Sequence, residues 1–467
     1  MSAVGADLRL DEAKVRKLRS AFTGELLLPA DARYDEHRRV WNGSIDRFPA
    51  IIARCGGVSD VVAAVRYARD AGLRVAVRGG GHSFPGFSTC DGGIVIDLSP
   101  MRAIAVDAVA RTVRAQAGAL LGDVDRATQA FGLAVPAGIV SHTGLAGLTL
   151  GGGIGWLMRK HGLTIDVLRR VELVTADARV ITASPVENPD LFWAVRGGGG
   201  NFGIATAFEF ALNAIGPIVL AGPIYWPIDR SADVLRFYRD WIADAPDELT
   251  TIVVHRTVQA LASIPREMHG RRVVMVNSCY AGPIDDGEKV LRPLRAFGAP
   301  LLDLCAPKPF VAHQSMLDTS FPAGWWYYVR SANLERLSDD VIDIIAARAQ
   351  EMTSPVTTFP IFQLGGVIRR VAAMETAFGG RDAGHVININ AITPTADGFA
   401  AERDWSQRFW SALRPHQMSA YTNFLMEEGE ERVREAHGAE RYARLQALKR
   451  RYDPDNLFRL NQNIPPD

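Results

Sequence analysis

The apolar pattern near the start of the chain predicts a β-α-β unit. Apolar residues recur at helical spacing between Val61 and Ala68, and Gly72 ends that pattern. Short apolar runs at 51–52 and 73–77 predict a strand on either side of the helix. The second strand leads the chain directly into a glycine-rich segment.

That segment runs from Arg78 through three consecutive glycines to His82, and continues to Gly86. Glycine has no Cβ, so its backbone can adopt a positive φ and approach a ligand closely. The Arg78 guanidinium is a permanent cation of the kind that binds pyrophosphate. By itself the segment predicts contact with a phosphate-bearing ligand and leaves open which one.

Glycines are distributed unevenly along the chain. Residues 72–93 and 138–203 together hold 20 of the 43 glycines. The run 147–155 is not a phosphate-binding P-loop, because no Gly-Lys-Ser/Thr follows it. This clustering of glycines therefore favours a backbone that wraps around one flat or phosphorylated ligand, and not a set of scattered turns.

The run 198–203 satisfies the dinucleotide pattern GxGxxG. A Rossmann site also requires a helix that begins at these glycines and an acidic residue about 20 positions further on. Residues 204–210 alternate between apolar and polar as a strand does, and no suitable acidic residue follows. We therefore reject a Rossmann site.

Composition excludes several classes of protein. The 467 residues call for two or three domains, and 52 basic against 52 acidic residues leave no net field that favours nucleic acid or acidic membranes. The basic run 449–451 is interpreted as a solvated helix face. No apolar run is long enough for a membrane span, and the N-terminus lacks the order of a secretory signal. Four scattered cysteines without a CxxC pair predict no metal site and no disulfide framework, so we expect a cytoplasmic protein.

Several separate motifs in order along nearly the whole chain resemble one family. The segments 78–83, 138–144, 151–156, 191–200, 421–424 and 456–466 are similar to those of the FAD-linked oxidases of the vanillyl-alcohol oxidase superfamily. The similarity is greatest to the bacterial members of the berberine bridge enzyme-like group.

The resemblance implies an α+β fold: a two-domain PCMH-type FAD-binding fold with an inserted substrate domain, whose antiparallel sheet is covered by helices. Residues 1–212 and 418–467 would form the FAD-binding domain, and residues 213–417 the substrate domain.

The resemblance also implies how FAD is held. His82 matches the histidine that is attached covalently to the flavin, and Val140 stands where many members carry a second, cysteine link. Valine cannot form a thioether, so we expect a single covalent bond. The implied cofactor-binding residues are His82, Arg78, Gly79, Gly80, Gly81, Ser83, Gly86, Gly138, Val140, Thr143, Gly147, Gly152, Gly153, Gly155, Gly203, Ile204, Tyr421, Asn423, Asn461 and Asn463.

The expected reaction is hydride transfer from a small organic substrate to the flavin, with O2 reduced to H2O2. The family's C-terminal motif makes Tyr421 the first candidate for the general base. Asn388 would position the substrate, and Thr143 beside His142 would face flavin N5 or oxygen unless it only completes a turn. Arg330 stands where relatives often carry a lysine and cannot serve as a base.

Three other interpretations stay open at this point: an oxygenase or oxidative cyclase, a dehydrogenase with another electron acceptor, and a flavin-binding protein without catalysis. An alcohol, an amine, a sugar or a phenolic natural product would each suit relatives of this fold as substrate. The expected partners are this small molecule and O2, without nucleic acid or membrane, and the sequence leaves the oligomeric state open.

Overall fold

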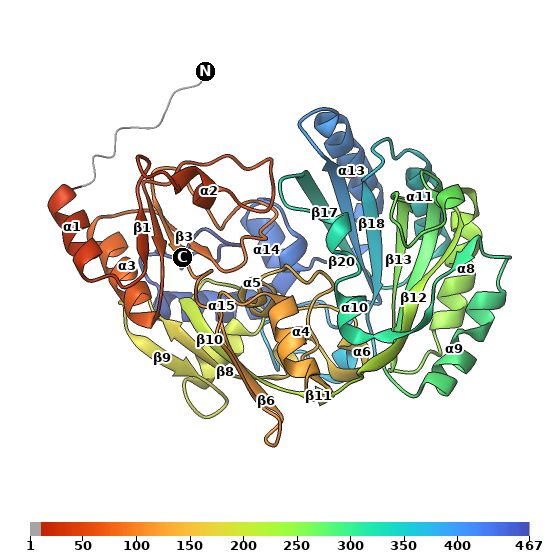
Figure 1. The fold of residues 1–467 in the computed structure, drawn as a ribbon, viewed down its shortest axis with the longest axis horizontal. Coiled ribbons are helices and arrows are strands. Elements are labelled where there is room, and N and C mark those ends of the chain that lie inside the picture. Colours follow the sequence, from red (N-terminus) through yellow and green to blue (C-terminus); the bar gives the residue numbers. More distant parts are fainter. Residues whose placement is uncertain (1–10, 467) are drawn as a thin grey trace.

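The computed structural model describes residues 11–466, in two parts that face each other across the middle of the molecule (Figure 1). Both ends of the chain contribute to one part, and the middle of the chain forms the other. The blue C-terminal helices in Figure 1 therefore return to the red and yellow N-terminal elements.

A four-stranded sheet carries the predicted β-α-β unit. β2 (Ile51–Arg54), α3 (Val58–Asp70) and β3 (Val75–Arg78) follow one another as the apolar pattern predicts. β4 (Ile94–Asp97) lies between β2 and β3 and runs parallel to both, while β1 (Glu25–Leu27) adds an antiparallel edge. Because β3 is the other edge strand, the glycine–histidine segment leaves the sheet at its margin.

A second, antiparallel sheet completes the N-terminal part. Its strand order is β5-β6-β10-β8-β9, and β10 (Ile204–Ala211) is its central strand. The strand that follows GxGxxG is thus confirmed, and no helix begins at those glycines. The other strands of this part are β5 (Ile104–Asp107), β6 (Thr112–Gln116), β8 (Leu168–Val174), β9 (Val180–Ala183), and the paired β7 (Leu133–Ala134) and β11 (Asn213–Ala214). Its helices are α1 (Glu12–Ser20), α2 (Tyr34–Arg38), α4 (Leu121–Gln129), α5 (Leu145–Leu150), α6 (Met158–His161), η1 (Thr164–Asp166) and α7 (Pro189–Val195).

The middle of the chain forms a nine-stranded antiparallel sheet with helices on its outer face (Figure 1). The strand order is β15-β12-β14-β13-β18-β19-β17-β20, and β16 also pairs with β12. The strands are β12 (Ile218–Pro227), β13 (Leu249–Thr257), β14 (Arg272–Tyr280), β15 (Leu302–Asp303), β16 (Ala306–Pro309), β17 (Trp326–Leu334), β18 (Thr358–Gln363), β19 (His385–Thr393) and β20 (Gln417–Ser419). The helices are α8 (Ser231–Ile242), α9 (Ile284–Ala296), α10 (Phe310–Gln314), α11 (Asp339–Gln350), α12 (Val367–Arg370) and α13 (Phe399–Leu413), with short turns η2 (Ile228–Arg230), η3 (Arg266–Met268), η4 (Asp318–Ser320) and η5 (Arg414–His416). β11 pairs with β7 and β20 with β17, so both parts continue slightly across the predicted limits of 213 and 417.

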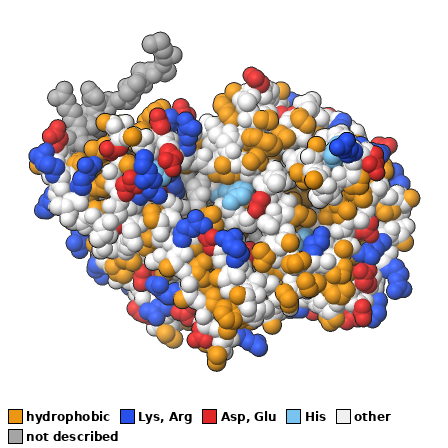
Figure 2. Space-filling view, viewed as in Figure 1, with side chains coloured by type: hydrophobic (Ala, Val, Ile, Leu, Met, Phe, Trp, Pro, Cys, Tyr) orange, Lys and Arg blue, Asp and Glu red, His pale blue; other side chains and the backbone are white. Residues whose placement is uncertain are grey.

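The surface carries charges of both signs, as the 52 basic and 52 acidic residues predict. Lys/Arg and Asp/Glu side chains are interspersed over the face drawn in Figure 2. Within residues 11–466, no helix is both long and apolar enough to cross a bilayer. Over the same range, no cluster of three or more His, Cys, Asp and Glu side chains could hold a metal ion.

The C-terminal tail is anchored by a buried ion pair. After η6 (Thr422–Phe424) and α14 (Glu430–His437), α15 (Ala439–Tyr452) ends beside Asp453. Lys449 Nζ lies 2.5 Å from Asp453 Oδ2, and both side chains are completely buried. The same ammonium donates to the carbonyls of Asn201 at 2.8 Å and Phe458 at 3.0 Å. The prediction that 449–451 is a solvated face is therefore wrong for Lys449, which joins the tail to the glycine run at 198–203.

Replacing this lysine tests its structural role. We expect Lys449→Met to lower the free energy of unfolding by about 3–5 kcal/mol, because Asp453 is left as an unpaired buried charge. Arg451→Met is the control, since Arg451 is exposed on the same helix; we expect it to change stability by less than about 0.5 kcal/mol. Urea denaturation followed by fluorescence measures both. Equal midpoints for the two variants would contradict the role given to Lys449.

Candidate flavin site

A cavity of about 340 Å³ lies between the N-terminal part and the inner face of the nine-stranded sheet. Its wall is built from residues within segments that are distant in sequence: 79–88, 138–151, 197–205, 421–425 and 458–462, not every residue of which faces the cavity. Histidine atoms are visible between the two halves of the molecule in Figure 2. The motifs that define the resemblance thus converge on one cavity.

Two of the glycine segments on this wall touch each other through their backbones. A Cβ on Gly80 would lie 2.5 Å from both Cα and N of Gly144, and a Cβ on Gly144 would lie 2.4 Å from Gly80 N. Only glycine permits this contact. At Gly147 and Gly200, by contrast, an added Cβ would have no protein atom within 4 Å, and both glycines line the cavity. The wall is therefore open backbone on which a flat cofactor fits.

His82 lies half-buried on the cavity wall. Its ring stacks on Trp41 with centroids 4.0 Å apart, and its Nε2 lies 3.1 Å from Nδ1 of His142 in a shared hydrogen bond. Burial, reinforced by His142, lowers the pKa of His82 to about 3. The imidazole is therefore neutral at pH 7. Since Nε2 faces His142, Nδ1 is the nitrogen left for another partner.

The loop that carries His142 is held by residues of the substrate part. Asp318 accepts hydrogen bonds from the Ser141 amide at 2.8 Å and the Ser141 hydroxyl at 2.5 Å. Gln314 Nε2 donates to the Gly138 carbonyl and to Asp125 Oδ2, both at 3.1 Å. Burial raises the pKa of Asp125 to about 7. Sequence reasoning missed these residues because no motif joins positions almost 200 residues apart.

Tyr421 and Asn423 lie on the wall as predicted, but their contacts change the role of Tyr421. The Tyr421 hydroxyl accepts hydrogen bonds from the Gly153 amide at 3.0 Å and from Asn423 Nδ2 at 2.9 Å. Burial nevertheless raises the pKa of Tyr421 to about 12. The phenol is protonated at pH 7, and with two bonds accepted its own proton is free to be donated. This geometry favours a hydrogen-bond donor over the general base expected from the motif.

Asn388 and Asn390 place two amide groups on the sheet side of the cavity. Both side chains are on one face of β19, as the period-two pattern predicts, and both line the cavity. Their Oδ1 atoms are buried, and neither has a hydrogen-bond partner among residues 11–466. Buried acceptors of this kind are normally hydrogen-bonded, so these two oxygens are positioned to accept hydrogen bonds from a ligand.

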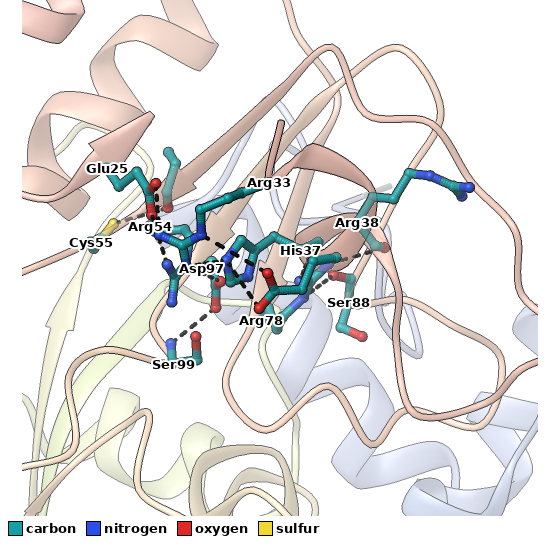
Figure 3. Close-up of polar contacts among 12 residues, drawn as sticks. Glu25, Arg33, His37, Arg38, Arg54, Cys55, Arg78, Ser88, Asp97 and Ser99 are labelled. Atoms are coloured by element: carbon teal, nitrogen blue, oxygen red, sulfur yellow. Dashed lines mark hydrogen bonds and ion pairs between the residues drawn. The ribbon is translucent and has the colours of Figure 1, made fainter. Parts of the chain in front are cut away.

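Arg78 does not serve the predicted purpose. Figure 3 shows its guanidinium directed into the protein, where it donates to the carbonyls of His37, Arg38 and Ser88. Its side chain is absent from the cavity wall. These carbonyls provide the acceptors that a buried cation requires, and the Asp97 carboxylate on the neighbouring strand β4 favours the charge electrostatically. Arg78 therefore braces the loops around β3 and does not face the cavity.

Several predicted glycines also lie off the cavity wall. A Cβ would lie 2.6 Å from Ile45 at Gly86, 2.6 Å from Phe378 at Gly152, 2.1 Å from Thr164 Oγ1 at Gly153 and 1.7 Å from the Ala137 carbonyl at Gly155. These glycines therefore allow close packing within the protein. Asn463 and His142 are likewise absent from the wall, and His142 contacts it through its hydrogen bond to His82. The wall does include the predicted Gly79, Gly80, Gly81, His82, Ser83, Gly138, Val140, Thr143, Gly147, Gly203, Ile204, Tyr421, Asn423, Asn461 and Asn388.

Aromatic residues complete the wall without having been predicted. Trp41 lies between His82 and Tyr327, and Phe321 and Phe362 face the cavity from the substrate part. Trp41 belongs to no glycine motif, so the sequence offered no signal for it. The Arg330 guanidinium forms an ion pair with Glu428 at 2.5 Å, which is the contact of a structural cation and not of a general base.

Comparisons with known proteins agree with this architecture. Residues 49–184 match the family model for an FAD binding domain, and residues 420–465 match the model described as berberine and berberine like. The chain is 32% identical to an FAD-linked oxidoreductase of Dictyostelium discoideum over 91% of each chain. It is also 32% identical to (R)-6-hydroxynicotine oxidase of Paenarthrobacter nicotinovorans, over 96% of this chain and 98% of that protein.

Solved structures are similar over the same extent. The crystal structure of 6-hydroxy-D-nicotine oxidase from Arthrobacter nicotinovorans superposes with a TM-score of 0.86 at 30% identity, covering 96% of this chain and 98% of that one. Glucooligosaccharide oxidase from Acremonium strictum shares the fold, with a TM-score of 0.86 at 24% identity, over 97% and 99% of the two chains. The chain belongs to the berberine bridge enzyme-like group of the vanillyl-alcohol oxidase superfamily, and is an FAD-dependent oxidoreductase.

The open wall at Gly147 can be tested by filling it. We expect Gly147→Ala to weaken FAD binding roughly 10- to 100-fold, because an added methyl in a packed contact costs about 1–3 kcal/mol. The fold itself should tolerate the change, since the methyl meets no protein atom. FAD incorporation at limiting cofactor measures the effect. Gly57→Ala is the control, because that site also has room but lies outside the cavity; equal incorporation in both variants would exclude Gly147 from the FAD site.

Proposed function

We propose that this protein is an oxidase that carries FAD on a single covalent bond to His82 and oxidises a small organic substrate. The observation that carries the proposal is the neutral, wall-lining His82, whose Nε2 is occupied by His142. A bond to the flavin 8α-methyl carbon requires an unprotonated nitrogen, which Nδ1 provides in the tautomer whose Nε2–H donates to His142. In forming that bond the methyl group and the imidazole would each lose a proton, and the two electrons would reduce the flavin, which O2 then reoxidises.

The number of covalent bonds to FAD depends on whether a cysteine thiol lies at the cavity. Glucooligosaccharide oxidase from Acremonium strictum holds a 6-S-cysteinyl, 8α-N1-histidyl FAD. In this chain Val140 lines the cavity, and all four cysteines are buried elsewhere and are absent from the wall. No thiol is in place for a second bond, which supports attachment through His82 alone.

The cavity side chains suit oxidation of a C–H bond next to a hydroxyl or amine. The chemistry that FAD would supply when bound is acceptance of a hydride from the substrate carbon. The two electrons and the proton of that hydride, with the proton lost from the hydroxyl or amine, would reduce O2 to H2O2. The amides of Asn388 and Asn390 would hold the substrate's polar group, and Tyr421 would donate a hydrogen bond beside it. Thr143 lines the same wall, and this position is the one its hydroxyl needs in order to contact flavin N5 or O2.

Acid precipitation tests the covalent bond. In the wild-type protein we expect all FAD to remain with the polypeptide, attached to a single peptide that contains His82 in mass spectrometry. His82→Ala should release its FAD completely on denaturation, whereas His416→Ala, a histidine outside the cavity, should retain it. Complete release of FAD from the wild type, or a second modified peptide, would contradict the proposal.

Reaction with oxygen tests the class of enzyme. We expect photoreduced protein to be reoxidised by air much faster than free reduced flavin, with about one H2O2 formed for each flavin. Stopped-flow absorbance and a peroxidase-coupled assay measure the rate and the yield. Reoxidation at the rate of free flavin would instead support a dehydrogenase with another acceptor. Oxygen-18 from O2 in the organic product would support an oxygenase.

A further inference from the structure

Arg256, on the inner face of the substrate sheet, is a cation without a counter-charge. Its Nε donates to the Thr257 carbonyl at 3.3 Å and its Nη1 to the Ser320 hydroxyl at 3.0 Å. A guanidinium has five N–H donors, so three are left without an acceptor in the described part of the chain. It forms no ion pair with any carboxylate of residues 11–466, although burial lowers its pKa. A half-buried guanidinium with three unused donors and no carboxylate partner calls for an explanation.

The guanidinium lines a small side pocket that also contains an unpaired amide. About 20 Å³ of free space is bounded by Arg256, Asn277, Thr358 and apolar side chains. Asn277 is 1% exposed, and neither its Nδ2 nor its Oδ1 has a hydrogen-bond partner in the structure. The space suits a compact polar group of one or two water-sized atoms. Two independent groups, one charged and one amide, thus face the same space.

Strand register connects this side pocket to the flavin cavity. Arg256 on β13 is directly opposite Thr358 on β18, which is directly opposite Asn390 on β19. Residues that face each other across adjacent strands project from the same side of a sheet. Two strand spacings put the Arg256 and Asn390 backbones about 10 Å apart. Ile139, Phe321 and Pro360 line both spaces, so the side pocket adjoins the flavin cavity.

We propose that Arg256 and Asn277 form an anion subsite and that the substrate carries a carboxylate. The guanidinium offers the parallel N–H groups that bind a carboxylate, and the Asn277 amide supplies a further donor. The carbon to be oxidised would lie near Asn388 and Asn390, and the carboxylate on the far side of Pro360. This inference rests on the proposed function, because it assigns the substrate class of the same cavity.

Paired ligands that differ only in charge test the subsite. The flavin spectrum of the holoenzyme is titrated with benzoate, phenylacetate and 3-phenylpropionate, and with the matching primary amides, at constant ionic strength. At least one carboxylate should bind about 10- to 100-fold more tightly than its amide, the range expected for charge-assisted hydrogen bonds. Arg256→Gln should abolish that preference, and Arg256→Lys should restore part of it. Arg336→Gln, on the exposed surface, should leave it unchanged.

Each remaining outcome decides the proposal. If no carboxylate binds better than its amide, or if the preference survives Arg256→Gln, the space holds only water or a simple ion and the proposal is overturned. If Arg256→Gln does not fold, Asn277→Asp replaces it; this near-isosteric change puts a negative charge on the same wall and should also remove the preference. Ligand binding is read without turnover, so slow reoxidation by O2 would refute the oxidase assignment and leave this result intact.

Discussion

The backbone contact between Gly80 and Gly144 is the constraint on which the site depends. It joins the loop after β3 to the loop that precedes α5, with no side chain between them. This contact brings His82 within hydrogen-bonding distance of His142 and places Val140 and Thr143 on the same wall. Any Cβ at either glycine would separate the loops and displace the histidine that we propose holds FAD.

The other side of the cavity is specified independently, by the nine-stranded sheet. Its inner face presents Asn388, Asn390 and Arg256 in a register set by backbone hydrogen bonds between β13, β18 and β19. Helices on the outer face bury the opposite side of these strands (Figure 1). The contacts of Asp318 with Ser141 then link the sheet part to the flavin loop. Cofactor chemistry and substrate choice are therefore carried by different parts of the chain, which meet along one interface.

Prediction from sequence succeeded where the signal was local. The strand at 73–77, the strand after the GxGxxG run and the shared face of Asn388 and Asn390 all follow from periodicity or from glycine placement, and the structure contains them. Prediction was wrong where a residue's partners are distant. The sequence predicts a phosphate ligand at Arg78 and a solvated charge at Lys449, yet both side chains are buried among carbonyl groups. Tyr421 stands where the motif predicts, but burial keeps its proton in place.

The sequence alone determined the order of the elements, the family, the histidine available for FAD and the absence of a cysteine at position 140. These depend on residue identity and on spacing within a few residues, which periodicity and glycine chemistry make readable. Only the tertiary structure decided which glycines face the cavity and which pack against protein. It also decided that Arg256 has no counter-charge beside the cavity and that the Asn277 amide has no hydrogen-bond partner among the described residues. Those properties depend on what lies within a few ångströms of an atom, and segments more than 100 residues apart supply it.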